Sequence, residues 1–275
     1  MERTYDLSAR TYVMGIFNIT PDSFSDGGIY FSGKPDLKKV MEDALKMEME
    51  GADFIDIGGE STRPGSDKIS VDEELERVIP VISALRSKVN IPISIDTYKS
   101  EVAEEALKAG ACIVNDISGF RFDSKLPEVT AKYKASCILM HIKGTPKNMQ
   151  TDPVYDDVVK EVFEYLKSSA VIAREAGIKQ IIIDPGIGFG KTLENNLDLI
   201  RNLYQFTKTG YPVLLGTSRK SFISGISEAP VDQRLEGTIA SNVIGIMNGA
   251  DIIRVHDVKE NCKAAKIADR ILNKA

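Results

Sequence analysis

The segment EGADFIDI, residues 50–57, has a pattern that recurs along the chain and indicates its fold. In it a glycine separates the end of a helical pattern from a short run of apolar and β-branched residues. KAGACIVND (108–116), EAGIKQIIID (175–184) and NGADIIRV (248–255) have the same order. Glycine tolerates the left-handed turn that ends a helix. Near-continuous apolar strands that alternate with helices indicate a parallel sheet buried on both faces.

The same alternation extends over the rest of the chain. The β-branched runs predict strands at 11–17, 54–57, 91–96, 112–116, 137–141, 180–184, 212–216 and 251–255. Amphipathic patterns predict helices at 36–50, 72–88, 100–109, 157–176, 193–207, 232–248 and 259–273, with a shorter and weaker one at 124–134. Eight strand–helix units in 275 residues predict an α/β protein with a single (β/α)8 TIM barrel, and a doubly wound open sheet is the rival fold. No linker or shift of composition divides the chain, so we expect one domain over residues 1–275.

Composition narrows the classes of partner. The net charge of −5 argues against a nucleic-acid surface, although a few focused cations could still hold one small anion. No apolar run is long enough for a membrane helix, and the first residues do not resemble a secretion signal. The 3 cysteines are odd in number and lie far apart, which is typical of reduced packing residues. We therefore expect a cytoplasmic protein.

Polar residues collect at the ends of the predicted strands. Such residues include Asn18, Asp96, Asn115, His141 and Asp184. Catalytic groups of a parallel barrel sit at the carboxyl ends of its strands and in the loops that follow. Unsatisfied buried polar groups cost about 1–3 kcal/mol each, so this concentration indicates a binding site rather than an accident of packing.

Motifs at these strand ends resemble those of the dihydropteroate synthases, in the family's order. They are MGIFNITPDSFSDGG (14–28), DIGGESTRPGS (56–66), SIDTYKSEVAEEALKAGACIVNDISG (94–119), MHIKGTP (140–146), DPGIGFGKT (184–192), GTSRKSF (216–222) and RVHDV (254–258). The resemblance implies a transferase of folate biosynthesis that joins a dihydropterin methyl diphosphate to 4-aminobenzoate and releases pyrophosphate. It also implies a sulfonamide target and a homodimer, for which the last helices are the expected contact.

Asp184 is the best candidate for binding the pterin ring. A carboxylate accepts two hydrogen bonds, which suits the paired donors of the pterin 2-amino group and ring N–H. The resemblance gives Asp184 this role and adds Asp96, Asn115 and Lys220 around the ring. The apolar walls would come from a set of residues that packing alone could also explain: Ile117, Met140 and Phe189.

Cations near the ends of the second and eighth strands are the candidates for the diphosphate. The resemblance places Arg254 and His256 on it, and Arg63 lies at the end of the second strand, which like the eighth adjoins the first strand in a closed barrel. An arginine fork can hold two phosphate oxygens at once. The family uses Mg²⁺, for which Asn18 is the matching residue, and one amide oxygen with phosphate oxygens and waters is a plausible magnesium shell.

The second substrate has its own pocket in the family. The matching residues here are Thr62, Pro64, Ser218 and Lys220, with the first two strand–helix loops, which we interpret as a lid at 20–34 and 58–70. GIGFGKT differs from a nucleotide-binding P-loop because Pro185 stands where that motif needs glycine.

The expected reaction substitutes an amine nitrogen for pyrophosphate at the pterin methylene. Asp96, Lys220, Arg254 and His256 are the catalytic candidates, and the sequence leaves open a dissociative path or direct displacement. Two alternatives share the pterin carboxylates. A corrinoid-linked pterin methyltransferase would need no diphosphate cations, and a non-catalytic pterin-binding paralogue would bind without turnover.

Overall fold

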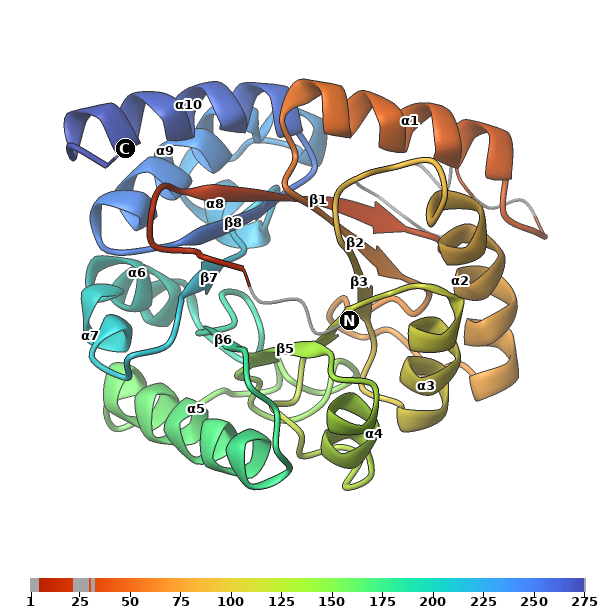
Figure 1. Cartoon of the computed structure of the whole chain (residues 1–275). Coiled ribbons are helices and arrows are strands. Elements are labelled where there is room, and N and C mark those ends of the chain that lie inside the picture. Colours follow the sequence, from red (N-terminus) through yellow and green to blue (C-terminus); the bar gives the residue numbers. More distant parts are fainter. Residues whose placement is uncertain (1–4, 22–29, 31–32, 275) are drawn as a thin grey trace.

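Eight parallel strands form the centre of the molecule. The computed structural model describes residues 5–21, 30 and 33–274. The strands are β1 (Tyr12–Asn18), β2 (Phe54–Gly58), β3 (Ile93–Asp96), β4 (Ile113–Asp116), β5 (Ser136–Met140), β6 (Ile181–Asp184), β7 (Leu214–Leu215) and β8 (Ile252–Val255). They follow the order β6-β5-β4-β3-β2-β1-β8-β7, and a parallel bridge from Ile183 to Val213 joins the two edges (Figure 1). The sheet closes into a TIM barrel, so the open-sheet alternative is wrong.

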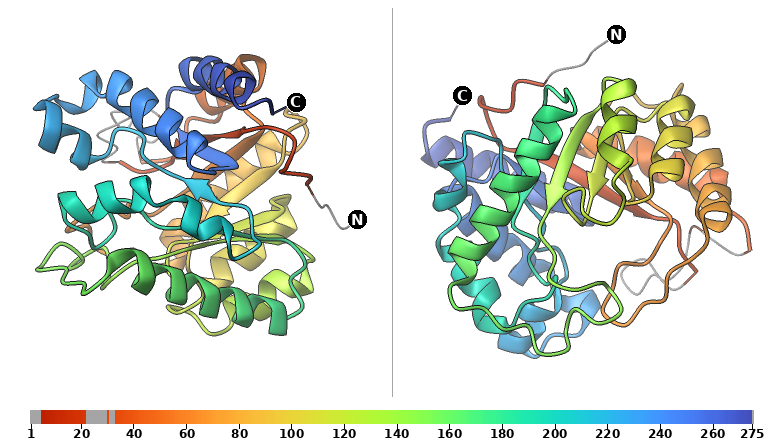
Figure 2. Two further views of the ribbon diagram at one scale, coloured as in Figure 1. Left: turned by 90° about the vertical axis from the view of Figure 1, so that its left-hand side faces the viewer. Right: turned by 90° about the horizontal axis from the view of Figure 1, so that it is seen from below.

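Helices form an outer layer around the barrel (Figure 2). They are α1 (Leu37–Glu50), α2 (Val71–Leu85), α3 (Ser100–Ala109), α4 (Leu126–Lys132), α5 (Val158–Glu175), α6 (Leu193–Arg201), α7 (Tyr204–Thr207), α8 (Ser221–Ser227), α9 (Leu235–Met247) and α10 (Val258–Ile271), with a 3-10 turn at Val231–Gln233. The predicted helix at 193–207 is divided into α6 and α7. Helix α8 was not predicted, because seven residues with a central glycine carry little periodic signal.

The barrel interior is divided along its axis into an apolar and a polar layer. The apolar layer takes one side chain from each of seven strands: Met14, Phe54, Ile113, Ile138, Ile182, Leu214 and Ile252. Side chains alternate between the two faces of a strand, so the residue two positions further on also points inward. Those next positions hold Asp56, Asn115, Asp184 and Arg254, among others. The apolar layer is therefore the floor on which the polar layer rests.

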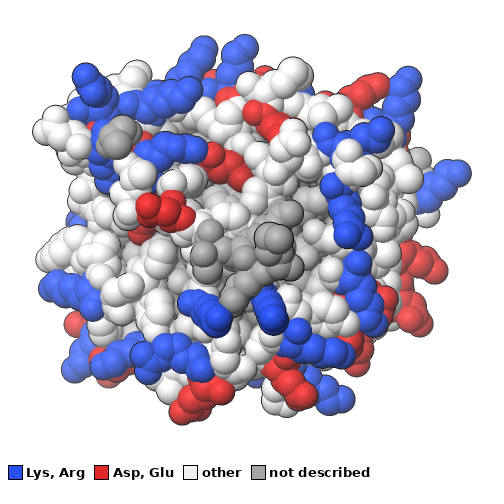
Figure 3. Space-filling model, viewed as in Figure 1, with Lys and Arg blue, Asp and Glu red and all other residues white. Residues whose placement is uncertain are grey.

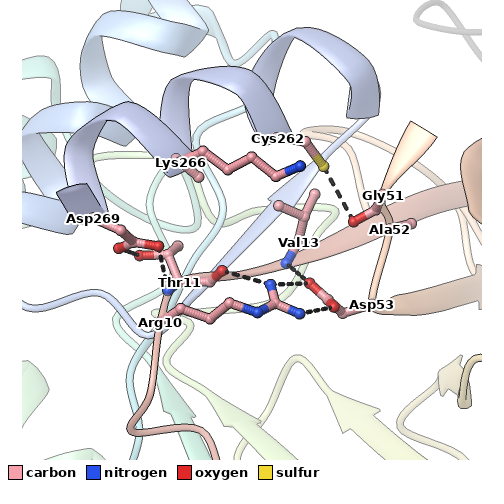
Figure 4. A pocket seen from close by; sticks show the side chains of 10 residues that line it. Arg10, Thr11, Val13, Gly51, Ala52, Asp53, Cys262, Lys266 and Asp269 are labelled. Carbon is pink, nitrogen blue, oxygen red and sulfur yellow. Dashed lines mark hydrogen bonds and ion pairs between the residues drawn. The ribbon is translucent and has the colours of Figure 1, made fainter. Parts of the chain in front are cut away.

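The opposite end of the barrel is stabilised by paired charges. A shallow pocket there is lined by residues that include Arg10, Thr11, Asp53, Cys262 and Asp269 (Figure 4). Asp53 binds Arg10 through both carboxylate oxygens, and Asp269 accepts hydrogen bonds from the Thr11 backbone N–H (2.8 Å) and hydroxyl (2.7 Å). Cys262 donates to the Gly51 carbonyl, and the three cysteines are unpaired, as predicted. These contacts join α10 to β1 and β2.

The surface seen in Figure 3 has basic and acidic side chains interspersed around its edge. No large area of one sign is visible on that face, in keeping with the modest net charge of −5. Among the described residues, no helix combines the length and apolar character needed to cross a membrane.

Candidate active site

A network of charged and amide groups joins β2, β3, β4 and β8 inside the barrel. Arg254 donates from Nε to Asp56 Oδ2 (2.6 Å) and from Nη2 to Asp96 Oδ2 (2.9 Å). Asn115 Nδ2 donates to the same Asp56 oxygen at 2.9 Å. Burial raises the pKa of Asp96 to about 7, although Arg254 acts in the opposite direction. The sequence-predicted residues Asp96, Asn115 and Arg254 are therefore in one network, whose centre, Asp56, was not predicted.

Asp184 and Lys220 lie on the other side of Arg254. A side-chain carbon at Gly216 would lie 4.0 Å from each of Asp184 Oδ2, Lys220 Nζ and Arg254 Cβ, so the three side chains converge on this glycine. Asp184 Oδ1 accepts a hydrogen bond from the Gly186 N–H at 2.7 Å. Burial raises the pKa of Asp184, and burial lowers that of Lys220 to about 8. Asp184 Oδ2 keeps acceptor capacity for a ligand with paired donors.

A buried lysine, Lys191, stabilises the glycine-rich segment 185–190 that follows β6. Lys191 Nζ contacts His141 Nδ1 (2.9 Å), the Gly186 carbonyl (2.8 Å) and the Phe189 carbonyl (2.9 Å). Lys191 Nζ also lies 3.4 Å from the His141 carbonyl oxygen, so Lys191 supports the loop through contacts within the protein. Burial lowers the pKa of His141 to about 2, so this histidine stays neutral.

The glycines of this segment fit close to the protein's own backbone. Gly186 has φ +68°, and a side chain there would come within 2.0 Å of the His141 carbonyl oxygen. Gly188, with φ +84°, instead faces the Lys220 side chain. Gly186 is therefore required by the protein's own packing, whereas Gly188 lies next to a candidate site residue.

The three predicted apolar wall residues share one cluster. Ile117 and Met140 are buried in it, and Phe189 packs against it, half-buried. Lys220 Nζ lies 4.6 Å from the centre of the Phe189 ring. This arrangement gives a flat heterocycle an apolar face next to the polar groups of Asp184 and Lys220.

His256 lies among cations after β8. Its Nδ1 is 2.9 Å from Ser218 Oγ. Burial lowers its pKa well below the ordinary value, and Arg219, Arg254, Arg63 and Lys220 lower it further. The structure thus brings the predicted diphosphate residues into one positive environment. Arg219 is itself bound by both oxygens of Asp257 (3.0 and 2.6 Å), so its charge is largely balanced.

The loop after β2 carries Thr62 and Arg63, both half-buried, and the exposed Pro64. A buried ion cluster anchors the start of this loop. Lys99 Nζ donates to Glu60 (2.6 Å) and to Glu74 (2.6 Å), and the Tyr98 hydroxyl donates to Glu60 (2.5 Å). The Gly65 N–H also donates to the Pro146 carbonyl at 2.9 Å, which connects the loop to the one after β5.

Asn18 ends β1 and pairs in register with Gly58 at the end of β2. It therefore lies at the same mouth of the barrel as the cations. Residues 22–29 and 31–32 of the first predicted lid loop, with the end of the first motif, lie outside the described residues.

Comparisons with known proteins agree with this geometry. A family model described as "Pterin binding enzyme" matches residues 14–256, which places the chain in the pterin-binding class. The chain is 47% identical over 275 residues to the dihydropteroate synthase of Clostridium beijerinckii, covering 99% of this chain and 98% of the relative. It belongs to the dihydropteroate synthase family.

Solved structures give the same result. The Yersinia pestis dihydropteroate synthase in a sulfonamide drug complex has a TM-score of 0.93 and 42% identity, over 98% of this chain and 97% of that one. The Clostridium difficile enzyme, solved in the presence of pteroic acid, has a TM-score of 0.89 and 48% identity, over 98% and 99%. The corrinoid-linked methyltransferase is thereby set aside.

Proposed function

We propose that this chain condenses (7,8-dihydropterin-6-yl)methyl diphosphate with 4-aminobenzoate, giving 7,8-dihydropteroate and pyrophosphate. The observation that carries the proposal is the convergence of Asp184, Lys220 and Arg254 on Gly216. The Asp184 carboxylate thus lies near the Lys220 ammonium and close to the β8 position that carries Arg254. The relatives from Clostridium and Yersinia bear the name of this activity.

The pterin is held by complementary hydrogen bonds. Asp184 Oδ2 accepts from the 2-amino group and ring N–H, while Asn115 and Lys220 contact the ring edge. Ile117, Met140 and Phe189 enclose its faces. Because the ring is fixed on both sides, its methylene points toward the cations after β8.

The chemical step forms a C–N bond from the 4-aminobenzoate nitrogen to the methylene and breaks the C–O bond to the diphosphate. The electron pair leaves with pyrophosphate, and the new secondary amine loses one proton to solvent. Arg63, Arg254 and His256 stabilise the negative charge that grows on the leaving group. His256 does so through a ring N–H donor. Asp96, when ionised, favours positive charge that develops on the pterin methylene.

We propose that Mg²⁺ binds at the mouth of the barrel where β1 ends, next to the diphosphate. Among the described residues no group of three or more His, Cys, Asp or Glu side chains could hold a metal ion. The family resemblance assigns the metal to Asn18, which would contribute its amide oxygen, with the diphosphate and water as the other ligands, and this suits an ion that keeps much of its hydration. When bound, Mg²⁺ neutralises diphosphate charge.

The 4-aminobenzoate would lie between the β2 and β7 loops. Ser218 and Lys220 offer donors to its carboxylate, and Thr62 and Pro64 would cover its ring. In this pose the amine nitrogen points toward the pterin methylene.

The test is a steady-state assay with both substrates and Mg²⁺ that follows pyrophosphate release and dihydropteroate formation. We expect both products in equal amounts. Pterin binding without product would instead indicate the non-catalytic paralogue.

A homodimer is supported by exposed apolar side chains on two neighbouring helices. Ile244 (49% exposed) and Met247 (58%) lie on α9, and Ile267 (63%) and Ile271 (70%) lie on α10. Sedimentation should show a dimer that Met247→Lys with Ile271→Lys dissociates. Met49→Lys on α1, where Met49 is 80% exposed, is the matched control and should remain dimeric.

The free cysteines support a cytoplasmic location, which fractionation of cells would test.

A further inference from the structure

Asp56 is a buried carboxylate in the middle of an apolar strand. Its neighbours Ile55 and Ile57 are fully buried, and its own side chain is 0% exposed. A buried charge without partners costs several kcal/mol, so the position requires an explanation. Substrate contact does not supply one, since nothing in the proposed pterin or diphosphate binding uses this residue.

Both hydrogen bonds to Asp56 reach a single oxygen. Oδ2 accepts from Arg254 Nε at 2.6 Å and from Asn115 Nδ2 at 2.9 Å. Oδ1 is buried without a partner among the described residues. One atom thus links a residue proposed to bind the diphosphate with one proposed to bind the pterin.

The contact fixes the orientation of the Asn115 amide. An ionised carboxylate only accepts hydrogen bonds, so the NH2 group of Asn115 must face Asp56. The Asn115 carbonyl oxygen then points away from Asp56. Asn115 can therefore offer an acceptor to the donors of a pterin, although its side chain contains both kinds of group.

The same contact limits how Arg254 binds an anion. Its Nε is used by Asp56, and Nη2 donates to Asp96. A guanidinium has five N–H groups, so three remain, at Nη1 and at the second position of Nη2. The diphosphate must then bind the Nη1 and Nη2 groups and not the Nε side. The sequence predicted that Arg254 holds two phosphate oxygens, and the structure indicates which nitrogens are left to do so.

We propose that Asp56 is a positioning residue that acts through one oxygen. It orients the Asn115 amide so that the carbonyl oxygen can accept hydrogen bonds from the pterin, and it orients Arg254 so that the Nη groups can bind the diphosphate. The inference rests on the proposed function for the identity of the ligands. Its tests measure binding, so they remain decisive if turnover fails.

The first experiment exchanges the two side chains. Pterin affinity is measured by calorimetry with 6-hydroxymethyl-7,8-dihydropterin, which lacks the diphosphate, for Asn115→Asp, for Asp56→Asn and for the double variant. Asn115→Asp alone sets two carboxylates against each other, and we expect a loss of affinity of about 50-fold or more. The added Asp56→Asn removes one of the two facing negative charges, so the double variant should regain about tenfold or more relative to Asn115→Asp. Strictly additive losses would overturn the inference.

The second experiment compares Asp56→Ala with Asp56→Asn. An amide oxygen can still accept from both donors, so Asp56→Asn should keep affinity for the pterin and for the pterin diphosphate within about tenfold of the original. Asp56→Ala should lose more than that for both ligands. Equal losses in the two variants would show that the charge matters and not the positioning.

Ser94→Ala is the matched control. Ser94 pairs in register with Asp56, and its buried Oγ has no hydrogen-bond partner among the described residues. This variant removes a buried polar atom without touching Arg254 or Asn115. Its affinity for both ligands should equal that of the original chain, with melting temperatures measured for every variant. A loss that matches Asp56→Ala would mean that any disturbance of this layer weakens binding, and the proposal would be wrong.

Discussion

Replacing Asp184 by asparagine tests the pterin site most directly. Asp184 is 5% exposed, and its Oδ1 accepts from the Gly186 N–H at 2.7 Å. In Asp184→Asn the amide oxygen must stay on Gly186, because an NH2 group there would meet another donor. The new NH2 then occupies the Oδ2 position, to which the proposed pterin pose directs its donor pair.

The size of the loss follows from these contacts. Two ligand donors lose their acceptor and face a donor, at about 1–3 kcal/mol each. The sum of ~2–6 kcal/mol corresponds to roughly 30-fold to 20,000-fold weaker binding. The side chain keeps its volume and its contact with Gly186, so the fold should be retained.

Calorimetry with a diphosphate-free pterin and thermal unfolding of the same samples are the assays. The matched control is Asp269→Asn, which changes a carboxylate of similar burial (6% exposed) at the far end of the barrel. Because both oxygens of Asp269 accept from Thr11, that variant should lose about 1–3 kcal/mol of stability and no pterin affinity. A folded Asp184→Asn protein with unchanged affinity would refute the assignment.

Three further outcomes are expected. Arg254→Ala should weaken binding of the pterin diphosphate by at least about tenfold more than binding of a pterin without that group, and equal losses by calorimetry would mean that Arg254 supports the ring or the fold. Burial lowers the pKa of Lys220 from 10.5 to about 8, so the folded protein holds fewer protons than the unfolded chain between these values. Its free energy of unfolding should therefore rise with pH across that window relative to Lys220→Met, and parallel denaturation curves at pH 7 to 10 would contradict this. A sulfonamide should raise the apparent KM for 4-aminobenzoate and leave kcat unchanged, and a fall in kcat alone would exclude the pocket that contains Ser218.

The barrel was predictable because the same strand–helix sequence pattern recurs eight times. All eight strands were expected near their observed positions, since each is an apolar run bounded by turn residues. The differences from the prediction lie between α6 and α9, where the local signal is weakest. Strand β7 has only two residues, and α8 has seven. Tertiary packing and not local propensity defines such short elements.

Side chains of the candidate site were predictable where a strand end displayed them. Asp96, Asn115 and Asp184 are the last or next-to-last residues of their strands, which marks them in the sequence. Lys191 was set aside as a P-loop residue, but its support of the glycine segment depends on His141, 50 positions away in the sequence. Contacts of this kind are formed only when the barrel closes.

Asp56 was missed although the alternation of strand residues could have found it. In β8, Ile252 and Arg254 are two positions apart and both point into the barrel. In β2, Phe54 and Asp56 have the same spacing and also both point inward. The inward polar layer then holds three carboxylates, Asp56, Asp96 and Asp184, against two cations, Arg254 and Lys220. An excess of carboxylates over cations would not be expected in a site built only for anions. In the proposed reaction these carboxylates would stabilise positive charge on the pterin methylene as the diphosphate departs, and Arg63 and His256 would contact the leaving group at the mouth of the barrel.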